Sequence, residues 1–142
     1  MNSLPTWFAE GQANYLGFTF SDKYIDSEIQ RKNALRGLVA SFPEIMSFST
    51  SDWSGWLKKI DSSYEFTFNN GLGYSVGELL LEDIYNKFGY LKVHKWLESI
   101  KVGLDYKAGF MSAFGLNYDE WLTTYASAYL LNQIQDLYRS GA

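Results

Sequence analysis

Apolar side chains recur at the spacing of an α-helix along most of this chain, and that period constrains its fold more than any other feature. The clearest stripe consists of Val76, Leu80, Ile84 and Phe88, which lie four residues apart and are followed at once by Gly89. Comparable stripes, most of them closed by a glycine or a proline, predict helices over residues 5–16, 21–42, 52–60, 75–88, 90–100, 105–114 and 118–137. We therefore expect an all-α fold in a single domain over residues 1–142.

Short polar side chains mark where several of these helices begin. Ser21 and Asp22 precede the second helix, and Asp52 precedes the third, so each is placed to accept hydrogen bonds from the free N–H groups of the first turn. Asn117, followed three residues later by Glu120, has the form of a capping pair. These residues predict the starts of three helices.

One segment departs from the helical period. Residues 64–68 alternate between aromatic and polar side chains, and the Asn69-Asn70-Gly71 sequence that follows is typical of a turn. We expect a short strand and a turn here. The strand is expected to pair with the alternating residues 18–20 as one small β ribbon.

Composition narrows the classes of function. Five Trp, eleven Tyr and ten Phe can fill a large core, and the absence of cysteine excludes disulfides and thiolate metal ligands. A net charge of −4 argues against a surface that binds nucleic acid, and no apolar run reaches the roughly 20 residues that span a bilayer. Met1 is followed by neither a basic nor an apolar stretch, so we expect no signal peptide in this chain. The cellular compartment stays unassigned.

The segment near the N-terminus suggests a family. Residues 7–15 read Trp-Phe-Ala-Glu-Gly-Gln-Ala-Asn-Tyr, and this resembles the Trp-x-x-Glu-Gly-x-Ala-x-Tyr segment that carries the third zinc ligand in gluzincin metallopeptidases. The resemblance implies that Glu10 occupies the position of that metal ligand. It also implies a helical fold like the C-terminal catalytic subdomain of gluzincins.

Two later segments extend the resemblance. Tyr74-Ser75-Val76-Gly77 is similar to the Tyr-x-x-Gly helix of gluzincin aminopeptidase-like proteins, and Tyr74 follows Glu10 by 64 residues, as in that group. The resemblance implies that Tyr74 is the catalytic tyrosine, whose hydroxyl donates a hydrogen bond to the oxyanion of the tetrahedral intermediate. Residues 110–121 weakly resemble the C-terminal pattern of the same family.

The family's other two zinc ligands are histidines of a His-Glu-x-x-His helix, and this sequence lacks that pattern. The only histidine is His94, which we expect to be an ordinary helix residue beside the apolar stripe of its helix. We therefore expect a fragment or remnant of a zinc peptidase that is inactive and zinc-free as this chain, whereas a complete relative binds zinc. The alternative is a free-standing helical module that binds other proteins without catalysis.

A second catalytic pattern overlaps the same residues. Gly73-Tyr74-Ser75-Val76-Gly77 matches the Gly-x-Ser-x-Gly elbow of serine hydrolases, so a serine hydrolase that uses Ser75 is a minor alternative. The elbow requires a strand before the serine and a histidine base close to it. Glu78 and Glu82 could be a pair of catalytic acids, although such pairs commonly form a solvated helix face.

The resemblance also leads to an expectation about partners. In gluzincins the first helix packs against the His-Glu-x-x-His helix, so here Trp7, Phe8, Phe18 and Phe20 are expected to lie on an uncovered apolar face. We expect a homodimer, or an adjoining segment, to cover that face, with no nucleic acid or membrane as partner. The alternative is that the helix over residues 25–42 folds back over it and leaves a monomer.

Overall fold

The computed structural model describes residues 4–11 and 27–139, and every regular element within these ranges is a helix. The first helical segment covers residues 6–11. The elements that follow are α2 (Ser27–Ser41), the 3-10 turn η1 (Pro43–Ser47), α3 (Thr50–Ser62), α4 (Tyr64–Asn69), α5 (Leu72–Phe88), α6 (Tyr90–Lys101), α7 (Tyr106–Phe114), α8 (Tyr118–Glu120), the π-helical segment η2 (Trp121–Ala126) and α9 (Ser127–Arg139). The expectation of an all-α fold is confirmed. None of these described helices is long and apolar enough to cross a bilayer.

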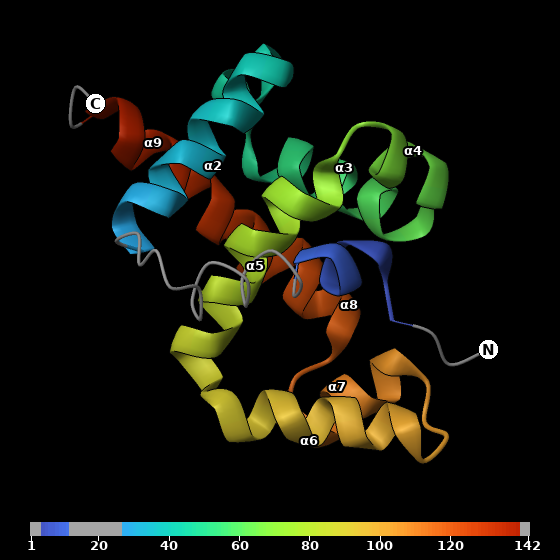
Figure 1. Cartoon of the computed structure of the whole chain (residues 1–142). Coiled ribbons are helices and arrows are strands. Elements are labelled where there is room, and N and C mark those ends of the chain that lie inside the picture. The colour runs from blue at the N-terminus through green and yellow to red at the C-terminus, as the bar shows by residue number, and fades with distance from the viewer. Residues whose placement is uncertain (1–3, 12–26, 140–142) are drawn as a thin grey trace, which may run out of the picture.

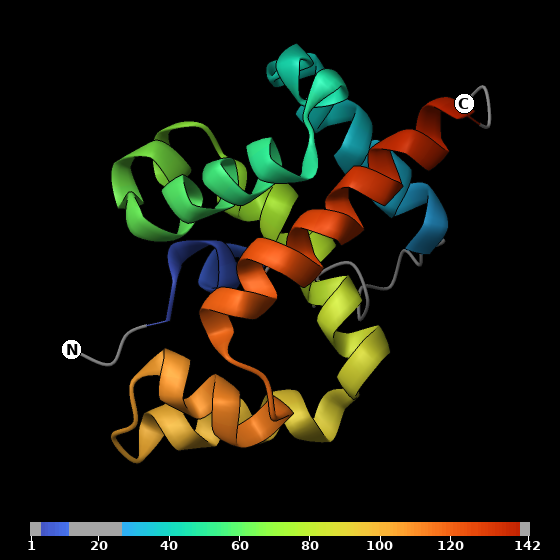
Figure 2. The same ribbon diagram turned by 180° about the vertical axis from the view of Figure 1, so that it is seen from behind.

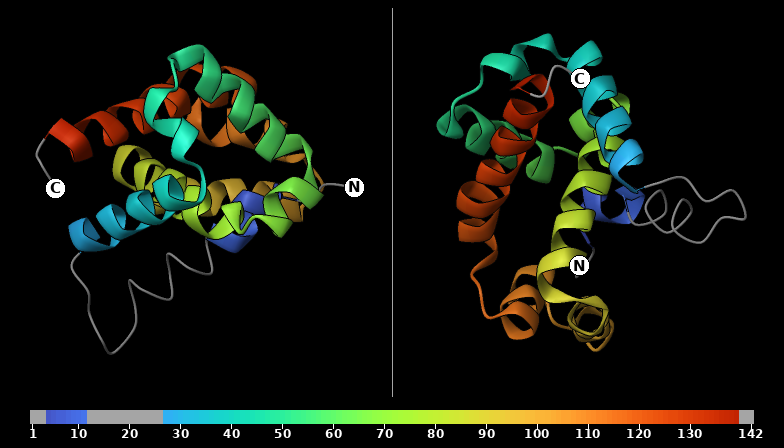
Figure 3. Two further views of the ribbon diagram at one scale, coloured as in Figure 1. Left: turned by 90° about the horizontal axis from the view of Figure 1, so that it is seen from above. Right: turned by 90° about the vertical axis from the view of Figure 1, so that its left-hand side faces the viewer.

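Helix α5 runs through the middle of the molecule (Figure 1). Seen from above, α2, α5 and the first helical segment form one layer, and α3 and α9 form the other (Figure 3). The hairpin of α6 and α7 closes one end, and α9, which passes behind α5 in Figure 1, lies in front of it in Figure 2. This arrangement brings the first helical segment against α5, far from it in sequence.

The predicted strand over residues 64–68 is wrong, because this segment is the helix α4. The Ser63 hydroxyl accepts a hydrogen bond from the Phe66 N–H, and the Thr67 hydroxyl donates to the carbonyl of Ile60 at 2.6 Å. Tyr64 and Phe68, four residues apart, stack at 5.5 Å, as neighbours on one helix face do. These contacts stabilise a helix although the residue pattern alternates. The proposed partner over residues 18–20 lies outside the described residues.

Most of the predicted helix ends are confirmed. The Asp105 carboxylate caps α7, and the Asn117 side chain accepts from the Glu120 N–H at 2.9 Å at the start of the last helix. The predicted cap of α3 is corrected. Ser49 rather than Asp52 is its N-cap, and Asp52 is the third residue of a reciprocal capping box. Helix α5 begins three residues earlier than predicted, and the predicted start of the helix before α3 lies outside the described residues.

The core is built largely from indole and phenyl rings. Four tryptophans have at most 1% of their surface exposed: Trp7, Trp53, Trp96 and Trp121. Trp7 stacks on Trp121 at 5.9 Å, and Phe8 meets Trp96 edge to face at 4.6 Å. The expectation that Trp7 and Phe8 lie on an uncovered face is therefore wrong, since α6 and η2 cover them rather than α2. Phe18 and Phe20 lie outside the described residues, and the homodimer itself stays a prediction that light scattering can test.

Candidate functional site

Glu10, the proposed ligand position, lies where the first helical segment crosses α5. Its carboxylate packs so closely against Gly73, the residue before Tyr74, that a Cβ on Gly73 would overlap carboxylate atoms. The buried oxygen Oε2 has no hydrogen-bond partner among the described residues. Loss of hydration raises the pKa of Glu10 above its ordinary value. The crossing thus holds a half-buried carboxylate, one oxygen of which is shielded from water and accepts no hydrogen bond from the described residues.

Glycines make this close crossing sterically allowed. A Cβ on Gly11 would lie 2.6 Å from the Cα of Gly77, and a Cβ on Gly77 would overlap the carbonyl oxygen of Trp7. Gly73 and Gly77 are one turn apart on α5, so together they present a surface without side chains to the first helical segment. The two glycines of the elbow pattern are thus explained by helix packing.

A carboxylate on α3 anchors the same segment from its other side. Asp61 Oδ1 accepts from Trp7 Nε1 at 3.2 Å and from the Tyr118 hydroxyl at 2.5 Å, and Asp61 Oδ2 accepts from the Tyr106 hydroxyl at 3.1 Å. Trp7 lies three residues before Glu10, so these bonds fix the turn that carries the Glu10 carboxylate. Sequence analysis missed Asp61, because no local pattern connects it to a residue 54 positions away.

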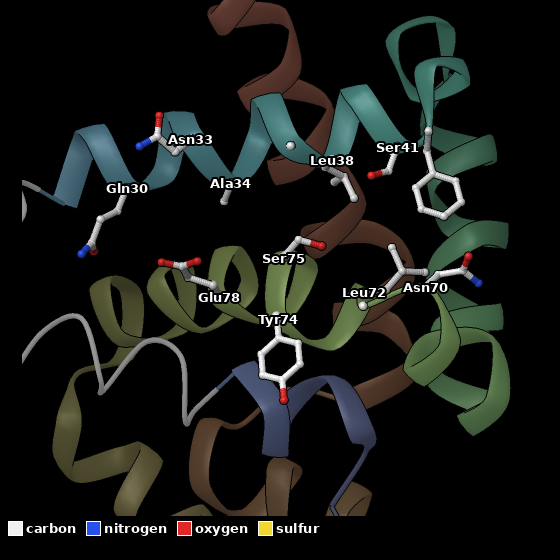
Figure 4. Close-up of a pocket in the computed structure, with 13 residues that line it drawn as sticks. Gln30, Asn33, Ala34, Leu38, Ser41, Asn70, Leu72, Tyr74, Ser75 and Glu78 are labelled. Carbon is white, nitrogen blue, oxygen red and sulfur yellow. The ribbon is translucent and has the colours of Figure 1, made fainter.

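Tyr74 lies in the first turn of α5, with 53% of its surface exposed. Figure 4 shows its hydroxyl pointing away from α2, toward the side on which the first helical segment lies. Because Glu10 packs against the preceding residue, Gly73, the two residues singled out by the resemblance come from one helix crossing. Sequence separation alone does not require this proximity.

Ser75 does not lie in the setting that a nucleophile elbow requires. It is the fourth residue of α5, and the element before it is helix α4 rather than a strand. Its side chain lies on the side of α5 that faces α2 (Figure 4). The one histidine, His94, lies on α6.

His94 is an exposed residue, with 56% of its side chain accessible. It stacks on Tyr90 at 6.2 Å, and its Nε2 lies 3.7 Å from the Glu98 carboxylate one turn further on. Within the ranges that the structure describes, no three His, Asp or Glu side chains converge as a metal site would require. The described residues therefore do not form a complete zinc centre.

Acidic residues of α5 are buried, which corrects the expectation of a solvated face. Glu78, Glu82 and Asp83 are between 5% and 8% exposed. Arg31 lies 3.7 Å from Glu82, and Lys87 lies 3.2 Å from Asp83. Burial raises the pKa of Glu82 and of Asp83, and the neighbouring cations oppose that rise without cancelling it. The carboxylates place acidic groups inside the α2–α5 layer.

A groove of about 400 Å³ separates α2 from the beginning of α5. Figure 4 shows its polar side chains arranged along both helices. The described residues that line it are Gln30, Asn33, Ala34, Gly37, Leu38, Ser41, Phe42, Asn70, Gly71, Leu72, Tyr74, Ser75 and Glu78. No motif in the sequence marked this groove, because its walls come from segments about 40 residues apart.

No protein-family model, curated protein or solved structure matches this chain.

Proposed function

We propose that this chain provides the third-ligand half of a gluzincin-like zinc peptidase, in which Glu10 is the ligand position and Tyr74 is the oxyanion-binding position. The observation that carries the proposal is the Glu10 carboxylate packed against Gly73, beside Tyr74, with a buried oxygen that accepts no hydrogen bond from the described residues. A carboxylate with a raised pKa gains more from a nearby cation than a hydrated one does. Carboxylate oxygen is also an ordinary zinc ligand.

The chain does not carry the whole centre. A hydrolytic zinc site takes three protein ligands, and the only histidine here is exposed on α6. We propose that a second segment or polypeptide supplies the other two ligands and the general base. As this chain alone, the protein is expected to bind no stoichiometric zinc and to hydrolyse no peptide.

Tyr74 has the chemistry for its proposed role. A neutral phenol donates one hydrogen bond, and such a donor stabilises negative charge that develops on oxygen in a transition state. Helix α5 supports Tyr74, and its glycines Gly73 and Gly77 let the first helical segment pack closely against this helix. Fixed donors accelerate reactions more than mobile ones, because they need no reorganisation during the reaction.

The test uses the protein purified from its natural host through an affinity tag. Metal content by elemental analysis and peptide hydrolysis are measured for the native sequence, Glu10→Gln and Tyr74→Phe. We expect about one zinc per chain in the natural assembly, loss of zinc in Glu10→Gln, and retained zinc with lost hydrolysis in Tyr74→Phe. Glu98→Gln and Tyr90→Phe, which change exposed residues of α6, are the matched controls. A natural assembly without zinc would overturn the proposal.

A helical interaction module is the second candidate, and one observation favours it. Tyr64 and Phe68 stack on each other on α4 while 62% and 55% of their surfaces remain exposed. Exposed aromatic side chains are enriched where proteins bind one another. The same purification separates the two candidates: a stable protein partner without zinc, released by Tyr64→Ser and Phe68→Ser, would support the module.

A further inference from the structure

The groove between α2 and α5 owes its space to small residues. Ala34 and Gly37 on α2 face the part of α5 that carries Ser75, and all three line the groove. A Cβ placed on Gly37 would meet no atom of the described residues within 4 Å, so none of their side chains fills that space. Its volume of about 400 Å³ is within the range of sites that hold small organic molecules.

Aliphatic side chains gather at one end of the groove, whereas the other end is polar. At the end near the start of α5, Leu38 and Leu72 contribute aliphatic surface, with the polar side chains of Ser41 and Asn70 beside them (Figure 4). At the other end, Gln30 extends from α2 toward Glu78 on α5 (Figure 4). A molecule that lies along the groove would thus bury an apolar body at one end and place a polar group at the other.

Gln30 indicates which polar group fits. Its Nε2 is buried and donates no hydrogen bond to the described residues. An amide N–H without an acceptor costs free energy, and a ligand carbonyl at this end would accept from it. The polar end therefore favours a ligand with an acceptor oxygen.

The charges of the residues that line the groove narrow the class of ligand further. None of the described residues that line the groove is Lys, Arg or His, and the one ionisable carboxyl among them is that of Glu78. A carboxylate or phosphate ligand would lose hydration without gaining a cation. We infer that the groove binds a small amphipathic molecule without negative charge that has an apolar body and an amide or ketone carbonyl. This inference is independent of the proposed zinc chemistry.

The test compares two probes that share one apolar body: 4-phenylbutanamide and 4-phenylbutanoate. Titration of the full chain is followed by backbone amide chemical shifts in NMR spectra. We expect the amide to shift signals of α2 and the start of α5, and to bind at least about tenfold more tightly than the anion. Binding of the anion as tight as that of the amide would overturn the inference.

Two variants locate the site. Gly37→Trp places a large side chain in the groove and should abolish binding, whereas Gly55→Trp, at a helical glycine that also has open space, should not. Gln30→Leu removes the donor and should weaken amide binding about fivefold. Circular dichroism confirms that each variant is folded. Unchanged amide binding in both Gly37→Trp and Gln30→Leu would place the ligand elsewhere and refute the inference.

Discussion

Gly11 and Gly77 touch through their backbones where the first helical segment crosses α5, so closely that a Cβ on Gly11 would lie 2.6 Å from the Cα of Gly77. This contact sets how deeply the segment sits, and it thereby sets the position of the Glu10 carboxylate against Gly73. It also explains why two helices can meet without interlocking side chains, since neither glycine has one. The geometry of the proposed site therefore depends on residues that have no side-chain functional group.

Adding one methyl group at this crossing should destabilise the fold. We expect Gly77→Ala to lower the free energy of unfolding by about 2–3 kcal/mol, because the backbone of the first helical segment must move. Gly55→Ala is the matched control, since its Cβ meets nothing and alanine suits a helix better, so stability should rise by about 0.5–1 kcal/mol. Urea denaturation measures both. Equal effects of the two substitutions would contradict the close crossing.

The hydrogen bonds to Asp61 should contribute measurably to stability. Asp61→Ala leaves the hydroxyl of the buried Tyr118 and the indole N–H of Trp7 without this acceptor, and we expect a loss of about 2–4 kcal/mol. The exposed Asp119, which pairs with Lys107 at 2.9 Å, serves as control, and Asp119→Ala should cost about 0.5 kcal/mol or less. Chemical denaturation compares them, and a small loss in Asp61→Ala would argue against the network.

Buried carboxyls on α5 should make stability fall as the pH rises. The pKa values of Glu82 and Asp83 are raised in the fold, so in the range just above their ordinary values of 4.5 and 3.8 the folded state holds protons that the unfolded chain has released. Their contribution is therefore full below those values and is lost as the pH passes the raised pKa values. Glu82→Gln should flatten this decline in thermal unfolding, whereas the exposed Glu98→Gln should leave it unchanged.

Three tyrosines should resist alkaline titration in the folded protein. Burial, and then the nearby carboxylate of Asp61, raises the pKa of Tyr118 and of Tyr106, and burial with Glu82 raises that of Tyr129. Above pH 10 the unfolded chain loses these protons and the folded chain keeps them, so stability should fall as the pH rises further.

The ultraviolet absorbance of tyrosinate, followed together with circular dichroism, tests this expectation. The last part of the absorbance change, at the highest pH, should coincide with unfolding. Tyr129→Phe should reduce that part, and Tyr90→Phe, at an exposed position, should reduce the early part instead. A titration completed before unfolding would show that these hydroxyls are accessible.

Local signals in the sequence determined the helices and most of their ends. The apolar stripe closed by Gly89, the end of the helix before Gly115 and the Asn117 cap depend on residues within one or two turns, so neighbouring residues were enough to predict them. Alternating aromatics over residues 64–68 misled the prediction, because the contact of Thr67 with Ile60 and the stacking of Tyr64 on Phe68 stabilise a helix.

Tertiary structure alone decided how the site is assembled. Asp61 meets Trp7 and Tyr118 across 54 and 57 residues, and Glu10 meets Gly73 across 63. No helical period or capping pattern encodes such contacts, because they depend on the angle at which two distant helices cross. The burial of Glu82 has the same origin: its solvent exposure depends on the helices that cover α5. The sequence by itself determined which segments are helices, and the packing of those helices determined which of their side chains meet.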